Sequence, residues 1–162
     1  MMSAMKLTHQ LRYDAPPDRV YAMLGDPAFR EEVCDFQGVL RRCVKVAPDG
    51  AGMTVEIDQT QAATGIPSFA QKFVGDRIQI IQHEAWASAT LADLFVEIPG
   101  KPGSMRGTIS IAPDPAGSIQ TVAAEVKVSI PLIGGKLERL VGDLLVSALK
   151  AENRVGRDYL SR

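Results

Sequence analysis

The sequence has few of the residues that metal and redox sites use, with two cysteines and two histidines among 162 residues. Cys34 and Cys43 lack C-x-x-C spacing, and no cluster of carboxylates accompanies His9 and His83. The composition therefore predicts two free, partly buried thiols, no metal and no cofactor.

The chain also lacks an excess of charge and long hydrophobic runs. Its formal net charge is −1, so no overall positive field would attract nucleic acid or anionic lipid. No apolar run reaches the roughly 18 residues of a membrane helix, and residues 1–5 are too short and too uncharged for a secretion signal. We therefore expect a cytoplasmic protein with no integral membrane segment and no nucleic-acid partner.

Internal repeats, low-complexity tracts and linkers are absent as well. Hydrophobic residues make up 46% and charged residues 23%, which is ordinary for a globular domain. Proline and glycine are spread along the chain as turns between elements. These observations predict a single domain over residues 5–162 and a short N-terminal extension, residues 1–4; the oligomeric state stays open.

The N-terminal part reads as one strand followed by two short helices. Residues 6–13 alternate between apolar and polar, as a half-buried strand does. Pro17 then fits the first turn of a helix, and Gly25 ends it. Asp26 as a cap and Pro27 as the first helical residue predict a second short helix.

From Gly38 the pattern has a period of two, which predicts strands joined by short turns. An apolar, partly helical connection interrupts them at 64–75. Consecutive strands with short turns form an antiparallel meander. The expected strands are 39–47, a return strand from Met53, then 77–86, 91–98, 104–112 and 118–130.

The C-terminal segment, residues 133–159, has the clearest pattern. Apolar residues recur every three or four positions over many turns, which predicts one long amphipathic helix of roughly 40 Å. Such a helix needs a partner surface, and the sheet is the only large one. We expect its outer face to carry Lys136, Glu138, Arg139, Asp143, Lys150, Glu152, Arg154 and Arg157.

This order of elements resembles the START/polyketide-cyclase/Bet v 1-like (SRPBCC) superfamily and, more narrowly, the DUF2505 family. The resemblance covers nearly the whole chain and is carried by residues 6–9, 15–21, 26–29, Trp86 and 130–138. It implies an α+β helix-grip fold, in which a curved antiparallel sheet of about seven strands wraps around the long C-terminal helix. It also implies a hydrophobic cavity between sheet and helix, but neither a particular ligand nor a reaction.

His9 is the first candidate for chemistry. It shares a strand face with Leu7 and Leu11, so its side chain is expected to point inward. An imidazole in a cavity could act as a general acid or base. The alternative is a structural histidine that is hydrogen-bonded to the sheet or helix.

Glu84 and Gln82 share a strand face with Ile80 and Trp86, but Ile81 lies on the opposite face. The inward face of residues 77–86 is therefore left open. If Glu84 points inward, desolvation would raise the pKa of its carboxyl group. If it points outward, the carboxylate is solvated. Trp86 fits a packed core better than a ligand platform.

Other candidates surround the expected cavity. Gln59 and Gln61 could anchor a ligand at its mouth or reach solvent. Ile66, Phe69 and Phe73 could form a lid or pack on the helix. With His9, the predicted cavity lining comprises Leu11, Phe36, Val55, Ile57, Gln59, Phe69, Phe73, Ile80, Gln82, Trp86, Met105, Ile109, Leu137, Val141, Leu144, Leu145 and Ala148.

Three functions are compatible with these patterns. The first is binding or transport of a hydrophobic small molecule, such as a lipid, isoprenoid or polyketide-like compound. The second is a cyclase, dehydratase or hydrolase that uses His9 and Glu84, which requires an acid/base pair that converges on one ligand atom. The third is an interaction module with a filled core and no cavity. A well-formed cavity would favour the first two.

Overall fold

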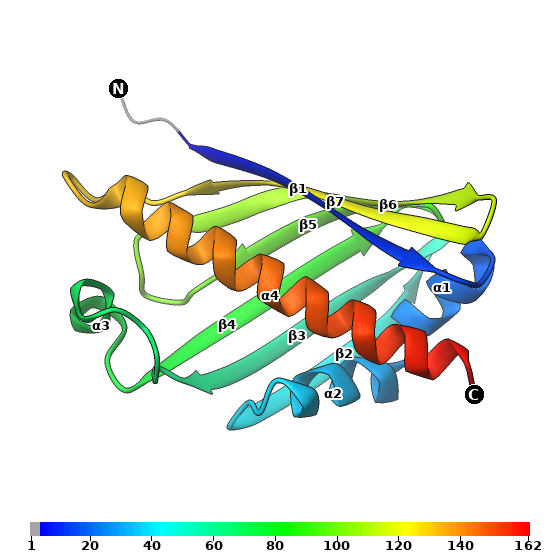
Figure 1. Ribbon diagram of the computed structural model, residues 1–162, viewed down its shortest axis with the longest axis horizontal. Helices are drawn as coiled ribbons and strands as arrows, with labels where there is room; N and C mark the ends of the chain where they lie inside the picture. The colour runs from blue at the N-terminus through cyan, green and yellow to red at the C-terminus, as the bar shows by residue number, and fades with distance from the viewer. Residues whose placement is uncertain (1–3) are drawn as a thin grey trace.

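The computed structural model describes residues 4–162, so residues 1–3 of the predicted N-terminal extension lie outside the described residues. A seven-stranded sheet forms one layer, and the long C-terminal helix runs diagonally across one of its faces (Figure 1). Two short helices cover one end of that face, and a third lies at the opposite end. The predicted α+β helix-grip architecture is confirmed.

The sheet is antiparallel throughout, in the order β1-β7-β6-β5-β4-β3-β2. Strands β2 to β7 form a meander because each strand pairs with the next one along the chain, and β1 pairs with β7. Short connections join these strands except β3 and β4, which the partly helical connection at 64–75 joins. The strands are β1 (Met5–Tyr13), β2 (Arg41–Asp49), β3 (Gly52–Ala62), β4 (Arg77–Trp86), β5 (Leu91–Glu97), β6 (Ser104–Asp114) and β7 (Gly117–Lys127).

The helices begin where the sequence places helix-starting residues. Pro17 and Pro27 are the first residues of their helices, and the Asp26 carboxylate accepts a hydrogen bond from the Ala28 N–H at 3.0 Å. The connection at 64–75 contains one short helix. The four helices of the described chain are α1 (Pro17–Leu24), α2 (Pro27–Phe36), α3 (Ser68–Val74) and α4 (Gly134–Leu160).

The last strand is shorter than predicted, because it ends at Lys127 rather than at 130. The next N–H, that of Val128, donates to the Glu138 side chain at 2.9 Å instead of to a strand. Glu138 was predicted on the outer face of the helix, and this was wrong, since only 6% of its surface is exposed. A buried carboxylate needs a donor, and the chain leaving β7 supplies one.

No helix within residues 4–162 combines the length and the hydropathy that crossing a membrane requires. The interior consists of two apolar clusters. The larger includes Leu11, Phe29 and Trp86 and lies where α1 and α2 close the sheet. The smaller joins Ala70 of α3, Val128 and Leu137 of α4 at the other end. The cavity described below lies between these clusters.

Gly156 lets α4 approach β1 and α1 closely. A Cβ atom at this position would lie 2.7 Å from the Tyr13 ring and 3.1 Å from the Met23 methyl group. Both neighbours are fully buried and cannot move aside freely. Gly156→Ala is therefore expected to lower the free energy of unfolding by about 1–3 kcal/mol in urea denaturation.

Gly135→Ala is the matched control, since no atom lies within 4 Å of a Cβ built there. Alanine is the better helix former, so this variant should be as stable as the wild type or more stable by up to about 1 kcal/mol. Equal effects at both positions would contradict close packing at Gly156.

Candidate functional site

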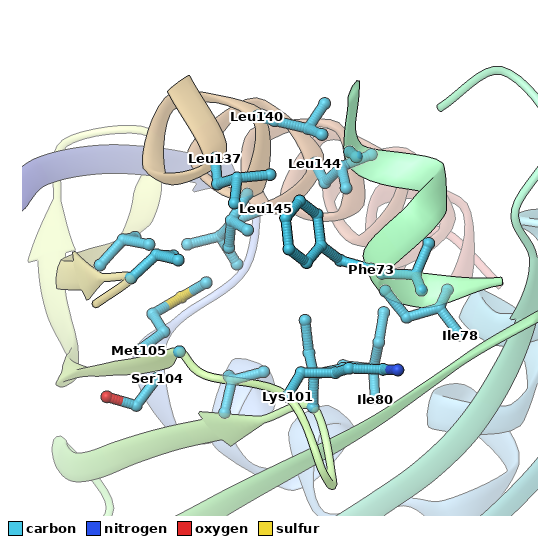
Figure 2. Close-up of a pocket in the computed structure, with 18 of the residues that line it drawn as sticks. Phe73, Ile78, Ile80, Lys101, Ser104, Met105, Leu137, Leu140, Leu144 and Leu145 are labelled. Atoms are coloured by element: carbon cyan, nitrogen blue, oxygen red, sulfur yellow. The ribbon is translucent and has the colours of Figure 1, made fainter. Parts of the chain in front are cut away.

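A cavity of about 160 Å³ lies between α4 and the sheet and is bounded by α3 and the loop 98–104 (Figure 2). Its wall is mainly aliphatic, with Phe73 entering from α3 and Leu137, Leu140 and Leu144 from α4. Ten residues of the predicted lining surround it: Gln59, Phe73, Ile80, Gln82, Met105, Leu137, Val141, Leu144, Leu145 and Ala148. The lining also includes Ile66, one of the residues considered for a lid, and Ala70, Ile78 and Ile98, which the sequence prediction left out.

The polar groups of this cavity are mostly neutral amides. Gln37, Gln59, Gln61 and Gln82 contribute side chains, and the Gln61 amide donates to the Gln59 oxygen at 3.3 Å. Lys101 is the charged lining residue, and no Asp, Glu or His of the described chain lines the cavity. An amide both donates and accepts hydrogen bonds, so this wall can orient an uncharged polar atom on an apolar molecule.

Several residues predicted to line the cavity lie elsewhere. Five of them point to the inner side of the sheet but are packed into the larger apolar cluster, because α1, α2 and the end of α4 fill that region: Leu11, Val55, Ile57, Trp86 and Ile109. Phe36 is 55% exposed, and its ring lies 5.9 Å from the Arg154 guanidinium. For these six residues the structure differs from the sequence prediction.

The two phenylalanines of α3 have different roles. Phe73 lines the cavity, as the lid hypothesis requires. Phe69 instead packs against the smaller apolar cluster, with the Lys136 ammonium 5.9 Å from its ring. Phe73 therefore lies as a lid residue would, whereas Phe69 packs against the helix. Through Phe73, α3 covers one side of the cavity.

His9 and Glu84 do not meet in the cavity. His9 lies half-buried on β1, opposite Val122 of β7, and does not line the cavity. Glu84 points inward, which decides the open question about β4, but its side chain is 1% exposed and fully engaged with other residues. An acid/base pair that converges on a bound molecule is therefore not formed by these two residues. Within the described chain, no three His, Cys, Asp or Glu side chains gather to hold a metal.

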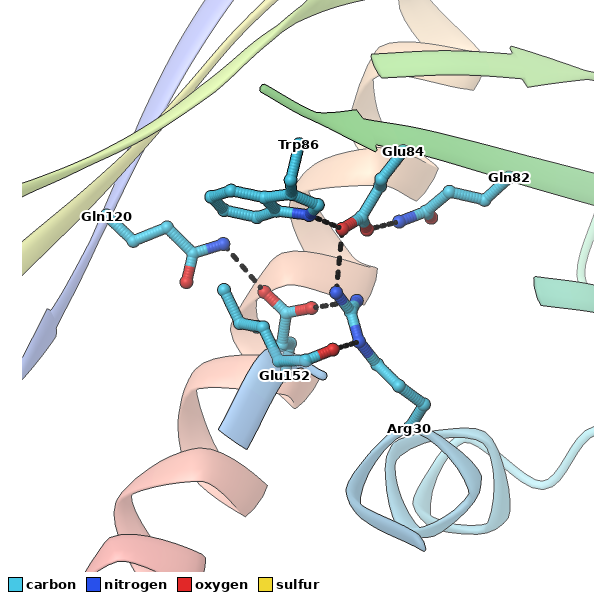
Figure 3. Close-up of polar contacts among 7 residues, drawn as sticks. Arg30, Gln82, Glu84, Trp86, Gln120 and Glu152 are labelled. Atoms are coloured by element: carbon cyan, nitrogen blue, oxygen red, sulfur yellow. Dashed lines mark hydrogen bonds and ion pairs between the residues drawn. The ribbon is translucent and has the colours of Figure 1, made fainter. Parts of the chain in front are cut away.

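Glu84 belongs to a buried ionic network beside the cavity (Figure 3). The guanidinium of Arg30 donates to Glu84 at 2.7 Å and to Glu152 at 3.3 Å. Its Nε donates to the Leu24 carbonyl oxygen at 2.8 Å, which satisfies the third side of the group. Arg30 comes from α2, Glu84 from β4 and Glu152 from α4, so the network joins three separate elements.

Neutral side chains complete the network and connect it to the cavity. The Trp86 indole N–H donates to Glu84 at 2.9 Å, and the Gln82 amide donates to the second Glu84 oxygen at 2.6 Å. The Gln120 amide donates to Glu152 at 3.2 Å. Because Gln82 also lines the cavity, it is the direct link between the cavity wall and the buried charges.

The pKa values of Glu152 and Arg30 both lie above their ordinary values, for different reasons. Burial raises the pKa of Glu152 above its ordinary value of 4.5, and the nearby Glu84 charge adds to the increase, while Arg30 opposes it. For Arg30, burial lowers the pKa, but the two carboxylates outweigh it and hold the pKa above its ordinary value. Arg30 thus stays charged, and Glu152 binds a proton more readily than an ordinary glutamate does.

One orphaned atom fits this interpretation. The Gln120 Oε1 is buried and has no hydrogen-bond partner. If the Gln120 amide group rotated by about 180°, its Oε1 would take the place of the nitrogen beside Glu152. A protonated Glu152 could then donate an O–H hydrogen bond to this oxygen. The network would then hold one guanidinium and one carboxylate, with no excess buried charge.

The sequence prediction missed Arg30 and placed Glu152 on the outer face of α4. Glu152 was assigned to the wrong helix face, and Arg30 was not assigned to any face. Arg30 directly follows the buried Phe29 and precedes Val33 by three positions, so it lies on the inner side of α2. Glu152 follows Leu145 and Leu149 at spacings of four and then three residues, which keep it on the same helix face. Charged residues on an apolar stripe were the signal that could have identified the pair.

Glu152→Gln should become more stable relative to the wild type as pH rises from about 4.5 to 7. The folded-state pKa of Glu152 lies above its unfolded value, so in this range the folded state binds more protons than the unfolded state. This group therefore favours folding below the unfolded pKa, and its contribution is lost as pH rises through the folded pKa. Urea unfolding of both proteins across this range measures the difference.

Asp35→Asn is a control for which the stability difference from the wild type should change with pH in the opposite direction. The hydrogen bond from Arg42 lowers the pKa of this exposed carboxyl group below its ordinary value of 3.8. Its contribution to stability is present above the unfolded pKa and is lost as pH falls through the folded pKa. A Glu152→Gln difference that is flat with pH, or that runs in the direction of Asp35→Asn, would contradict the raised pKa.

Comparisons with known proteins agree with this fold. The model of a family described as "Protein of unknown function (DUF2505)" matches residues 8–160. The uncharacterized proteins Rv0481c of Mycobacterium tuberculosis and Mb0491c of Mycobacterium bovis are each 29% identical over 123 residues, which is 68% of this chain and 69% of theirs.

Solved structures share the architecture at low sequence identity. TTHA0849 from Thermus thermophilus is 21% identical, with a TM-score of 0.61 over 93% of this chain and 96% of that one. The di-domain ARO/CYC StfQ from the steffimycin biosynthetic pathway is 10% identical, with a TM-score of 0.69 over 96% of this chain and 50% of that one.

Norcoclaurine synthase from Thalictrum flavum, in complex with dopamine and hydroxybenzaldehyde, is 14% identical, with a TM-score of 0.62 over 97% of this chain and 88% of that one. At these identities the likeness shows the fold alone. The fold that they share with this chain is the Bet v 1/START-like helix-grip fold.

Proposed function

The chain belongs to the DUF2505 family, and from that premise we propose that it binds a hydrophobic small molecule in the cavity between the sheet and α4. The observation that carries this proposal is the wall itself, which is aliphatic with a few neutral amides. Apolar side chains favour an apolar body, and a small number of hydrogen-bonding groups fixes its orientation. A lipid, an isoprenoid or a polyketide-like compound has this chemistry.

The size of the cavity limits what can be fully enclosed. At about 160 Å³ it is close to the apolar cavities that hold one benzene molecule. A ligand of one ring or a short branched chain therefore fits the structure as it stands. A larger molecule would require α3 and the loop 98–104 to move outward, since these segments bound the cavity.

Catalysis has less support than binding. The cyclase, dehydratase or hydrolase hypothesis relied on His9 and Glu84, and neither residue lines the cavity. The amides of Gln59, Gln61 and Gln82 can hold a polar atom but have no proton to exchange near neutral pH. The hypothesis of a filled interior also has less support, because the cavity separates the two apolar clusters.

Two measurements on the purified chain test the proposal. Native mass spectrometry of protein prepared without detergent or organic solvent should show an adduct that denaturation releases. After its removal, the protein should bind the small apolar fluorescent dye naphthalene saturably at one site, and benzene should displace the dye. Protein that carries no adduct and shows no saturable dye binding would exclude the proposed function.

A further inference from the structure

A leucine projects from the turn between β7 and α4. Leu132 is 101% exposed, the highest value among the large hydrophobic residues of the described chain. It also has a φ angle of 72°, and no other non-glycine residue among 4–162 has a positive φ. Leucine in this left-handed region is strained, and an apolar side chain gains nothing in water. Neither folding nor solubility explains why this residue is held outward.

Apolar and basic residues share the end of the molecule at which Leu132 lies. The half-buried Ile133 and Phe69 lie beside the same small cluster, next to Leu137. Three segments meet at this end of the molecule, namely 64–77 with α3, the loop 98–104, and 127–139 (Figure 1). They carry Lys72, Arg77, Lys101, Lys127, Lys136 and Arg139.

The charge of this end contrasts with that of the whole chain. The three segments hold six of the 18 basic residues but only Asp76 and Glu138 of the 19 acidic ones. Glu138 is buried and bonded to the Val128 N–H, so it contributes little outward charge. The chain as a whole has a net charge of −1, and the positive charge is therefore local to this end.

An exposed apolar tip at an end whose segments carry six exposed basic side chains is complementary to an anionic lipid surface. Lysine and arginine are attracted to the negative headgroups, and a leucine that enters the acyl boundary gains the free energy of burial. Neither signal alone gives stable binding, but the two together give a reversible attachment. A protein partner would match the leucine equally well but would not require basic charge spread over three segments.

We propose that this end, comprising Leu132, Ile133 and the surrounding basic residues, docks the protein reversibly on anionic membranes. The cavity lies behind the same end, since Lys101, Phe73 and Leu137 line it. Docking would therefore place the cavity's surrounding segments, α3 and the loop 98–104, against the lipid. The surface itself does not depend on what the cavity holds.

Co-sedimentation with lipid vesicles tests the proposal. The protein should bind vesicles of phosphatidylcholine mixed with phosphatidylglycerol more strongly than vesicles of phosphatidylcholine alone, and added salt should weaken the binding. Leu132→Gln should lower the partition coefficient about tenfold or more. Lys101→Gln and Lys136→Gln should each lower it about fivefold on anionic vesicles.

Leu91→Gln is the matched control. Leu91 is 49% exposed at the start of β5, at the opposite end of the sheet from α3, so its loss should leave vesicle binding unchanged. Ala148→Trp, which narrows the cavity, should also bind vesicles normally, and this separates docking from the proposed function. Three results would overturn the proposal: no vesicle binding, equal loss for Leu132→Gln and Leu91→Gln, or self-association in ultracentrifugation that Leu132→Gln abolishes.

Discussion

Replacing Arg30 by methionine is expected to lower the free energy of unfolding by about 3–5 kcal/mol. The substitution keeps much of the side-chain volume but leaves Glu84 and Glu152 buried without their common cation. Domains of this size are stable by only about 5–15 kcal/mol, so the loss would be a large fraction of the total. Urea denaturation followed by circular dichroism gives the value.

The physical basis of this effect is the asymmetry of buried charge. Arg30 and Glu84 have side chains that are 2% and 1% exposed, so water cannot solvate the remaining carboxylate. Attraction within such a pair offsets the cost of desolvating both members, and removing one member leaves that cost uncompensated. Protonation of the two glutamates would relieve part of it, so the destabilisation should be smaller at acidic pH.

Two further variants make this expectation specific to the network. Arg41→Met removes a pair with Asp58 in which the arginine is 51% exposed, and it should cost less than about 1 kcal/mol. The triple variant Arg30→Met, Glu84→Gln, Glu152→Gln should be more stable than Arg30→Met alone, because no uncompensated charge remains. A single variant as stable as the wild type, or a triple variant no better than the single one, would contradict this account.

Ala148→Trp is expected to reduce binding of the apolar dye at least about tenfold. Ala148 lines the cavity from α4, and the indole would occupy volume that a ligand needs. Overpacking of this kind costs about 1–3 kcal/mol of stability, which leaves the fold intact in a domain of this size. Fluorescence titration gives the affinity, and circular dichroism checks that the variant is folded.

Ser147→Trp is the matched control, because Ser147 is the neighbouring residue on the exposed face of the same helix. It introduces the same side chain outside the cavity and should bind the dye like the wild type. If both tryptophan variants bind equally well, the dye site is not this cavity. If both lose binding together with their helical signal, a smaller substitution, Ala148→Leu against Ser147→Leu, repeats the comparison.

Local periodicity determined most of the fold. Alternation over 6–13 and the three-four spacing over 133–159 needed no partner to be recognised, because each pattern reflects the geometry of one element. The turn residues between strands then favoured a meander, and the observed sheet order follows it. Boundaries were less certain, as at β7, whose end depends on a hydrogen bond to a helix that comes later in the chain.

Local periodicity predicted only part of the candidate site. Periodicity places Val55 and Gln59 alike on one face of the same strand, yet Val55 is packed core and Gln59 lines the cavity. Which of them lines the cavity depends on how much of the sheet α1, α2 and α3 cover. Local sequence patterns do not predict the extent of that coverage. Similarly, the face of β4 that carries Glu84 could not be chosen until the sheet register was known.

The elements, their order and the long helix that must cover a sheet could all be predicted from the chain alone, because they follow from the spacing of apolar residues along it. The three-dimensional arrangement was needed to show that Arg30, Glu84 and Glu152 form one buried network, and that Leu132 stands outward at an end whose segments carry exposed basic residues. These groupings join segments far apart in the chain, or depend on how separate loops meet at one end. Burial and electrostatic pairing act through space, whereas a sequence pattern records only neighbours along the backbone.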